Sequence, residues 1–152
     1  MPVLERLPED ARRLLGLDVG DRRIGVAVSD PTGLLATPVE VYTRRNDDAD
    51  VEHVSGLAHE LEVEGIIVGL PVNMNGTEGP QAEKTRAFAA ALAMQGGDVL
   101  LWDERLSTVE AERRMSESGR RRKRGAVMRS DAEAAAVILE SYLDSLRVRV
   151  SR

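Results

Sequence analysis

Apolar residues in the first part of the chain follow the pattern of a sheet. The apolar runs 14–20 and 24–29, separated by a polar turn, predict a β-hairpin that bends near Gly20-Asp21-Arg22-Arg23. The β-branched and aromatic residues from Thr37 to Tyr42 indicate a third strand at an edge. From Asp47 to Glu62 the apolar residues recur at helical spacing, which predicts a helix with one face on the sheet.

The second part alternates short apolar runs with helical patterns. The runs 65–69 and 99–102 predict buried strands of a parallel sheet, with a helix from Pro80 to about Met94 between them. Capping boxes predict further helices that begin at Ser107 and Ser130. The resulting order, βββαβαβαα, predicts an α/β protein with a mixed five-stranded sheet, in which an antiparallel hairpin half joins parallel βα units and helices cover both faces. This order resembles the ribonuclease-H-like fold.

The composition is that of an ordinary globular protein. The 152 residues suit one domain, and 42% of them are apolar and 31% charged. No apolar stretch approaches 18 residues and the first ten residues lack a secretion-signal pattern, so we expect neither a membrane span nor export. The absence of cysteine excludes disulfides and fits a cytoplasmic location. With only His53 and His59 available, a structural zinc site is not expected.

Charge is distributed unevenly along the chain. The net charge is −5, yet the segment 113–129 contains a single acid, Glu117, against Arg113, Arg114, Arg120, Arg121, Arg122, Lys123, Arg124 and Arg129. A local basic tract of this kind can bind phosphates even on an acidic protein. The alternative interpretation is a solvated loop that has no binding role.

Three short acidic segments stand where buried elements end or begin. They are Leu17-Asp18-Val19-Gly20, Trp102-Asp103-Glu104-Arg105 and Ser130-Asp131-Ala132-Glu133. A hard divalent cation requires carboxylates that lie on separate elements and are brought together by folding. A buried carboxylate without a partner costs several kcal/mol, so Asp18 needs a cation, an ion-pair partner or solvent. The three segments therefore predict a metal-dependent phosphodiesterase.

Each of these carboxylates also has a simpler explanation. Asp18 could be a solvated turn residue, and Asp103 and Glu104 could be strand-end acids paired with Arg105. Because neighbouring strand residues point to opposite faces, we expect only one of this pair to face a site. We choose Glu104, whose longer side chain can reach a shared cation, with Asp103 in a supporting role. Asp131 would be stabilised by the start of its helix, but aspartate is common there for capping alone.

Other chemistries find little support in the sequence. The chain has no Gly-x-x-x-x-Gly-Lys-Ser/Thr loop, and Gly69 to Gly76 lacks the spacing of a dinucleotide-binding turn. No cysteine nucleophile exists, and His53 and His59 are expected on a solvated helix face. Nucleotide-binding and cysteine-dependent enzymes are therefore disfavoured.

Four motifs occur in a fixed order over most of the chain, from about Leu14 to Leu146. They are Leu17-Asp18-Val19-Gly20 through Arg23-Ile24-Gly25-Val26-Ala27, then Val68-Gly69-Leu70-Pro71 with Asn75-Gly76 and Gly79, then Asp103-Glu104-Arg105-Leu106-Ser107-Thr108, and last Asp131 with Ala134-Ala135 and Ile138-Leu139. Together they resemble the YqgF (RuvX) family, Holliday-junction-resolvase-like nucleases that are regarded as pre-16S ribosomal RNA nucleases. One position departs from the pattern, because Ser130 stands where an apolar residue is expected; the capping box gives a local reason.

This resemblance implies a ribonuclease-H-like nuclease domain over residues 14–152, preceded by an N-terminal extension over residues 1–13. It implies that Asp18, Glu104 and Asp131 are the catalytic, metal-binding residues of a divalent-metal-dependent endonuclease. It further implies a cytoplasmic enzyme that processes the 5′ end of pre-16S ribosomal RNA in ribosome biogenesis. Resolution of Holliday junctions, which are branched DNA, is the alternative activity.

A site of this kind would hold two Mg²⁺ or Mn²⁺ ions roughly 3.5–4 Å apart, and its products would carry a 5′ phosphate and a 3′ hydroxyl. Basic residues near the acidic motifs and in the basic tract are expected to bind the nucleic acid: Arg22, Arg23, Arg105, Arg120, Arg121, Arg122, Lys123 and Arg124. Because the chain has only four aromatic residues, recognition by shape and phosphate is expected over base stacking.

Two further functions compete with the nuclease interpretation. Actin-like ATPases share the hairpin-first fold and an acidic-glycine first strand, but they use two such domains and adenosine motifs that this chain lacks. A non-catalytic RNA-binding assembly factor would retain the acids as structural remnants. For a nuclease, both structured RNA and branched DNA fit as substrates, and symmetric cutting of a junction would require a homodimer.

Overall fold

A mixed five-stranded sheet forms the centre of the protein, in the order β3-β2-β1-β4-β5. The computed structural model describes residues 3–8, 10–107 and 130–150, with side chains through residue 147. The strands are β1 (Leu14–Val19), β2 (Arg23–Ser29), β3 (Ala36–Thr43), β4 (Gly65–Leu70) and β5 (Val99–Asp103). β1 pairs antiparallel with β2 and parallel with β4, β2 pairs antiparallel with β3, and β4 pairs parallel with β5. The predicted hairpin half and parallel half are both confirmed.

Burial follows the position of each strand in the sheet. The central strands β1 and β4 are buried at every position, as their continuous apolar runs require. The edge strand β3 is exposed or partly exposed throughout, in keeping with its mixed sequence. The acidic residue of β1, Asp18, therefore lies in the most buried layer of the protein, where a charge needs a structural or chemical reason.

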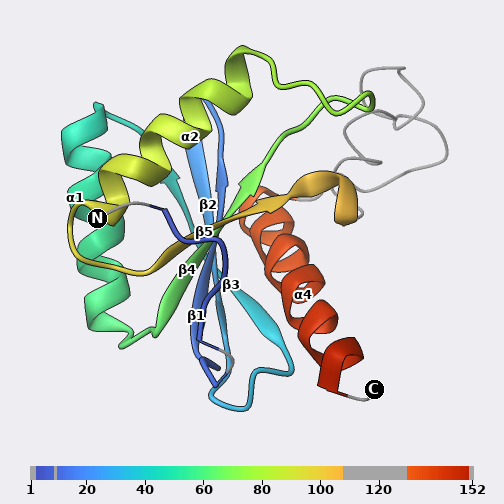
Figure 1. The fold of residues 1–152 in the computed structure, drawn as a ribbon. Helices are drawn as coiled ribbons and strands as arrows, with labels where there is room; N and C mark the ends of the chain where they lie inside the picture. The colour runs from blue at the N-terminus through green and yellow to red at the C-terminus, as the bar shows by residue number, and fades with distance from the viewer. Residues whose placement is uncertain (1–2, 9, 108–129, 151–152) are drawn as a thin grey trace, which may run out of the picture.

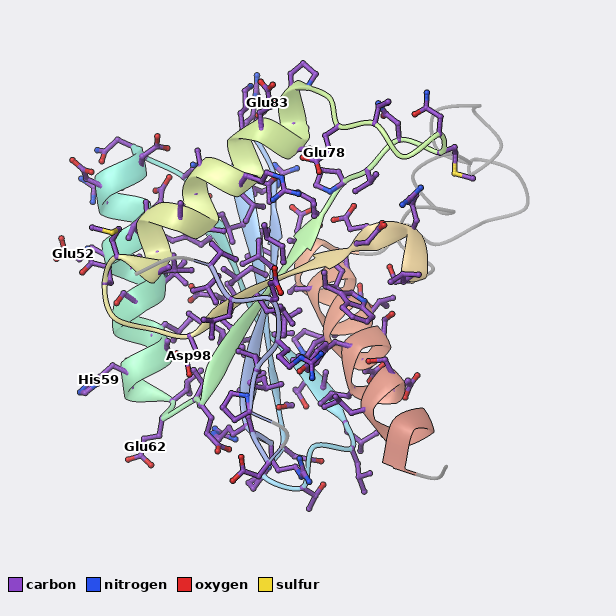
Figure 2. The ribbon with its side chains drawn as sticks, viewed as in Figure 1. Glu52, His59, Glu62, Glu78, Glu83 and Asp98 are labelled. Atoms are coloured by element: carbon purple, nitrogen blue, oxygen red, sulfur yellow. The ribbon has the colours of Figure 1, made fainter. Side chains whose placement is uncertain are left out.

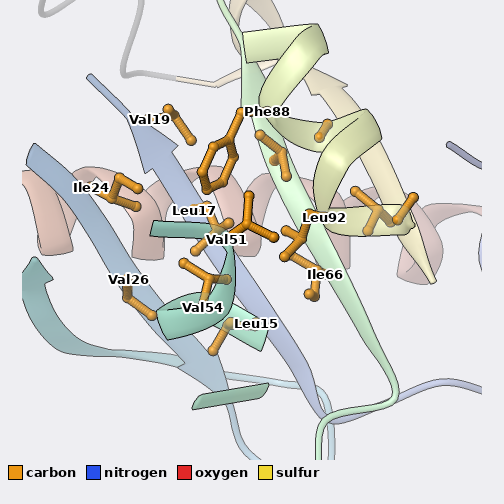
Figure 3. Close-up of a cluster of buried hydrophobic side chains, with 14 residues drawn as sticks. Leu15, Leu17, Val19, Ile24, Val26, Val51, Val54, Ile66, Phe88 and Leu92 are labelled. Carbon is orange, nitrogen blue, oxygen red and sulfur yellow. The ribbon is translucent and has the colours of Figure 1, made fainter. Parts of the chain in front are cut away.

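Helices cover both faces of this sheet, as Figure 1 shows. α1 (Asp47–Glu60) and α2 (Pro80–Ala93) lie on one face, and α4 (Asp131–Val150) lies on the other. In the core below α1 and α2, Val51, Val54, Phe88 and Leu92 pack on Leu17 and its strand neighbours (Figure 3). A second core lies between α4 and the opposite face. The prediction of helices on both faces is confirmed, and no described helix is long and apolar enough to cross a membrane.

Helix starts agree with the signals in the sequence. Asn46 caps α1 by accepting a hydrogen bond from the Ala49 N–H at 2.8 Å, and Pro80 opens α2. A short 3₁₀ helix, η1 (Glu104–Leu106), follows β5 directly and was not predicted. Ser107 closes η1. The helix predicted to begin there, and the basic tract 113–129, fall on residues 108–129, outside the described part of the chain.

The segment before β1 packs against the sheet. The Leu4 N–H donates to the Val99 carbonyl at 2.8 Å, and Leu4 forms a parallel bridge with Leu100. Leu7 and Ala11 are 3% exposed and belong to the core beneath α4. Thus the described residues of the predicted N-terminal extension contribute to the hydrophobic core and line the edge of β5.

Candidate active site

Asp18 lies near the carboxyl end of β1 and faces α4. Its strand neighbours Leu17 and Val19 belong to the core under α1 and α2, so the alternation of side chains directs Asp18 to the opposite face. A Cβ atom at Gly16, two residues earlier, would lie 2.9 Å from Cβ of Leu139 on α4, which identifies the same face. Asp18 is only 5% exposed and pairs with Gly25 across the β1–β2 ladder.

Gly25 brings the first turn of α4 against the sheet. A Cβ atom at position 25 would lie 1.8 Å from the carbonyl oxygen of Asp131 and 2.8 Å from the backbone nitrogen of Ala132. Only glycine allows so close an approach of two backbones. Because Gly25 is the cross-strand partner of Asp18, this contact places the start of α4 beside the strand position of Asp18.

Asp131 begins α4 and forms an ion pair with Arg23. The predicted capping box is confirmed: the Ser130 hydroxyl accepts from the Glu133 N–H at 3.1 Å, and the Glu133 carboxylate accepts from the Ser130 N–H at 2.9 Å. The Asp131 side chain does not take part in this cap. Instead its Oδ2 accepts a hydrogen bond from Nε of Arg23, the first residue of β2, at 2.9 Å.

Glu104 reaches the same face from the end of β5. It is 1% exposed, and its Oε1 lies 2.9 Å from where a Cβ atom of Gly69 would stand. The same Cβ would lie 2.6 Å from Cδ1 of Ile138 on α4, so Gly69 and the Glu104 carboxylate are on the α4 side of the sheet. Since Leu17 pairs with Val68, Gly69 lies next to Asp18 on the neighbouring strand.

Hydrogen bonds hold η1 between β5 and α4. Ser141 of α4 accepts from Nε1 of Trp102 at 3.0 Å and donates its own hydroxyl hydrogen to the Leu106 carbonyl at 2.8 Å. The Ser107 hydroxyl donates to the Glu104 carbonyl at 2.9 Å. These contacts fix the backbone that carries Glu104, so α4 positions both Asp131 and Glu104.

Asp103 points elsewhere and pairs with Arg105. Its carboxylate accepts from the Arg105 backbone N–H at 2.8 Å and from Nη2 of the guanidinium at 2.7 Å. Burial raises the pKa of the Asp103 carboxyl, but the hydrogen bonds from Arg105 outweigh it, and the pKa lies below its ordinary value. Nη1 of Arg105 also contacts the carbonyls of Asn73 and Met74 at 3.4 Å. The alternative interpretation, an acid paired with Arg105, therefore describes Asp103.

Asp18, Glu104 and Asp131 thus lie on one face of the sheet, at the edge where β1, β4 and β5 end. Mg²⁺ and Mn²⁺ prefer oxygen ligands, so the chemical type of these three side chains suits such an ion. Gly25 and Gly69 carry no side chain, which lets the backbone of Asp131 and the carboxylate of Glu104 approach the sheet closely. Within residues 3–8, 10–107 and 130–150, however, no three Asp, Glu or His side chains are grouped closely enough to hold a metal. Asp131 is instead turned to Arg23.

Of the basic residues predicted to bind nucleic acid, three are described. Arg22 and Arg23 are exposed on the β1–β2 turn and the start of β2, beside the acidic edge. Arg105 forms an ion pair with Asp103 at 2.7 Å. The predicted residues Arg120, Arg121, Arg122, Lys123 and Arg124 fall outside the described residues.

The histidines lie on the far side of the sheet from the acids. Both belong to α1; Figure 2 shows His59 on its outer surface, and His59 is exposed. His53 stacks on Tyr42 with ring centroids 4.1 Å apart and hydrogen-bonds Glu40. The expectation of a solvated face holds for His59, whereas His53 is half-buried in a local contact.

Sequence reasoning gave no separate role to Gly25 and Gly69, which make the close approaches at this site. Their signal was present, because a glycine inside an otherwise apolar strand often marks a place where another backbone or a ligand comes near. The partner that comes near, α4 in both cases, is separated from them by more than 60 residues of sequence.

Known proteins resemble this chain over nearly its whole length. It is 49% identical over 135 residues to a protein of Halothermothrix orenii named "Putative pre-16S rRNA nuclease", covering 87% of this chain and 94% of that one. A Clostridioides difficile protein of the same name is 48% identical over 134 residues, with 87% and 94% coverage.

Among solved structures, that of Thermus thermophilus RuvC in complex with a Holliday junction substrate has a TM-score of 0.56 at 16% identity. It covers 92% of this chain and 96% of that chain. At this level of identity the likeness shows a shared fold, which supports the predicted ribonuclease-H-like arrangement. A family model described as "RuvX: Holliday junction resolvase" matches residues 12–145. With this match and relatives of nearly half-identical sequence, the chain belongs to the RuvX family of nucleases.

Proposed function

We propose that this protein is a divalent-metal-dependent endonuclease whose metal-binding residues are Asp18, Glu104 and Asp131. The proposal rests on their location: the three residues, from β1, η1 and α4, lie on the same face of the sheet and at the same edge. Two of them, Asp18 and Glu104, are at most 5% exposed. Moving a carboxylate out of water costs free energy, so solvation at the surface does not explain their position. Membership of a nuclease family supports the reaction class.

Mg²⁺ or Mn²⁺ bound by these residues would activate a water molecule for attack on a phosphodiester and stabilise the leaving oxygen. Asp18 near the end of β1 and Glu104 after β5 supply carboxylates on either side of β4, and both lie on the α4 face of the sheet. Asp131 joins them when its carboxylate leaves Arg23. Arg23, released in this way, is then positioned to bind a phosphate of the substrate.

The proposed physiological substrate is the precursor of 16S ribosomal RNA, cut at its 5′ end in ribosome biogenesis, which places the protein in the cytoplasm. The names of the relatives from Halothermothrix orenii and Clostridioides difficile support this choice. The description of the family model as a Holliday junction resolvase favours branched DNA as the second candidate. Symmetric cutting of a junction would require two copies of the chain.

One assay tests metal dependence and substrate together. The full-length protein is incubated with a pre-16S RNA fragment and with a four-way DNA junction, in Mg²⁺, in Mn²⁺ and in EDTA. We expect metal-dependent cleavage of the RNA at the mature 5′ end and none in EDTA. Faster cutting of the junction would shift the assignment to branched DNA. Cleavage that persists in EDTA, or none of either substrate with any metal, would overturn the metal-nuclease proposal.

Replacing Arg23 by glutamine is expected to tighten Mn²⁺ binding. The variant removes the cation that pairs with Asp131, and an exposed ion pair contributes roughly 1 kcal/mol at most, so the gain is up to about fivefold in affinity. Free Mn²⁺ measured by electron paramagnetic resonance gives the affinity without any nuclease assay.

Arg22→Gln is the matched control, because it removes the neighbouring charge but no described ion pair, and its Mn²⁺ affinity should stay at the wild-type value. If the Arg23 variant binds Mn²⁺ no more tightly than this control, Arg23 and the metal do not compete for Asp131.

A further inference from the structure

A groove lies on the other face of the sheet from the candidate active site. Its volume is about 650 Å³, within the range of small-ligand sites. The β1–β2 turn, the connection from β3 to α1, the start of α1, and α2 form its walls. Val51, Ala87 and Phe88 contribute apolar surface, while Arg22, Arg45 and Lys84 bring positive charge.

A buried ion pair fixes the wall of this groove. Asp50 of α1 is 1% exposed and accepts from Nε of Arg44 at 2.8 Å. Nη1 of Arg44 also donates to the Gly20 carbonyl at 2.8 Å, and its guanidinium lies 5.3 Å from the centre of the Phe88 ring. Burial raises the pKa of Asp50, but the hydrogen bonds from Arg44 and its neighbours bring it below the ordinary value. This network joins the hairpin turn, α1 and α2 in one rigid unit.

The same network holds the backbones of two exposed arginines. The Arg22 carbonyl accepts from the Arg44 N–H at 2.8 Å, and the Arg45 N–H donates to Oδ1 of Asp50 at 2.9 Å. The side chains of Arg22 and Arg45 are both exposed, and neither guanidinium forms an ion pair with any carboxylate of the described residues. The guanidinium groups of Arg22 and Arg45 therefore line one groove, and hydrogen bonds fix the backbone of both residues.

Every acid that lines the groove already has a cationic partner. Asp47 and Asp50 pair with Arg44, and Asp21 pairs with Lys84 at 3.3 Å. The Lys84 pair is exposed on both sides, so it contributes little and can open when a phosphate approaches. Arg44 is shared by two of these acids, so the lining, with four cations and three acids, has a net charge of +1 on a chain whose net charge is −5. The cations of the groove that form no ion pair with a described carboxylate are the guanidiniums of Arg22 and Arg45.

The groove adjoins the acidic edge through the hairpin turn. Arg22 lines the groove, and the next residue, Arg23, contacts Asp131 on the α4 face. A guanidinium group can bind two phosphate oxygens at once. An arginine that forms no ion pair within the protein can do this without breaking one. The acidic edge and the groove lie on opposite faces of the sheet, so a second segment of nucleic acid can reach the groove while the first lies at the acidic edge.

We propose that this groove binds the phosphate backbone of a second segment of a folded nucleic-acid substrate, through Arg22 and Arg45. The inference rests on the proposed nuclease function and deepens it. The enzyme then favours substrates in which two segments lie close together, because the acidic edge and the groove lie on opposite faces of the sheet.

The test measures binding separately from cleavage. Arg22→Gln, Arg45→Gln and the double variant of the full-length protein are titrated in EDTA with labelled hairpin RNA and with a short single-stranded RNA. For the hairpin we expect the double variant to lose about tenfold in affinity and its salt-dependence slope to fall by about 2, since each phosphate contact contributes about 1. For the short single strand, the affinity should stay at the wild-type value.

Arg6→Gln is the matched control, since it removes one exposed arginine that lies outside the groove and should leave both affinities unchanged. Thermal unfolding establishes that the variants are folded. Unchanged hairpin affinity and salt slope in the double variant would overturn the proposal. An equal loss for hairpin and short strand would also overturn it, because the arginines would then bind the strand being cut. Absence of cleavage by every protein, including wild type, would count against the nuclease function and not against the groove.

Discussion

Asp18→Asn is expected to reduce metal-dependent cleavage by more than about 100-fold, because loss of even a supporting partner of a metal ligand typically costs 10- to 100-fold. The substitution keeps the shape of the side chain and removes its charge, so it takes one carboxylate from the proposed metal site. Asp18 is 5% exposed near the carboxyl end of β1, and a neutral amide is easier to bury there than a carboxylate. The variant should therefore be folded.

Single-turnover cleavage of the pre-16S fragment in Mn²⁺ measures this effect, and urea unfolding measures the stability. Asp48→Asn is the matched control, because Asp48 is an exposed acid in the first turn of α1, on the opposite face of the sheet. We expect it to cleave at the wild-type rate. Near-wild-type cleavage by Asp18→Asn would remove Asp18 from the site and, with it, the proposed grouping of the three acids.

Gly25→Ala is expected to give the largest loss of stability among single-methyl substitutions in the sheet. The added Cβ would lie 1.8 Å from the Asp131 carbonyl oxygen, and neither backbone can move without shifting α4 or β2. Overpacking usually costs 1–3 kcal/mol, and a backbone clash of this kind should reach about 3 kcal/mol or more. Because the clash displaces the first turn of α4, Mn²⁺ affinity should fall together with stability.

The chain supplies a direct comparison in Gly56 of α1. A Cβ atom there would meet nothing within 4 Å, and the residue lies inside a helix. Gly56→Ala should therefore stabilise the protein by about 0.5–1 kcal/mol, the usual gain for alanine over glycine in a helix. In urea unfolding, the free energy of unfolding should be lower than wild type for Gly25→Ala and higher than wild type for Gly56→Ala. A Gly25→Ala protein as stable as wild type would mean that α4 does not rest on Gly25.

The sheet could be predicted because its signals are local. The buried runs of β1 and β4, the turn at Gly20 and Pro80 at the start of α2 each act within a few residues. That only one of Asp103 and Glu104 faces the site followed from a local rule, the alternation of strand side chains, and Glu104 was chosen for its longer side chain. The structure places Glu104 on the α4 face and Asp103 against Arg105. That Glu104 binds metal stays a prediction.

The contacts that complete the site depend on how α4 docks, and no short pattern encodes that. Arg23 and Asp131 are 108 residues apart, and their ion pair exists only because Gly25 lets α4 approach β2. η1 was missed for a related reason, since a hydrogen bond from Ser141 of α4 to the Leu106 carbonyl holds it in place. The groove was missed as well, because its basic residues come from a turn, a connection and a helix.

The spread of the three acids along the chain bears on when the protein can act. Asp18 stands in the first strand, and Asp131 is synthesised more than 100 residues later, on the helix that also holds η1 in position. A nascent chain on a ribosome therefore exposes its first strand well before α4 exists, and domains of this size fold as units. If the proposed site is correct, an unfinished chain carries no nuclease activity, so ribosomal RNA next to the site of its synthesis is protected until translation has passed Asp131.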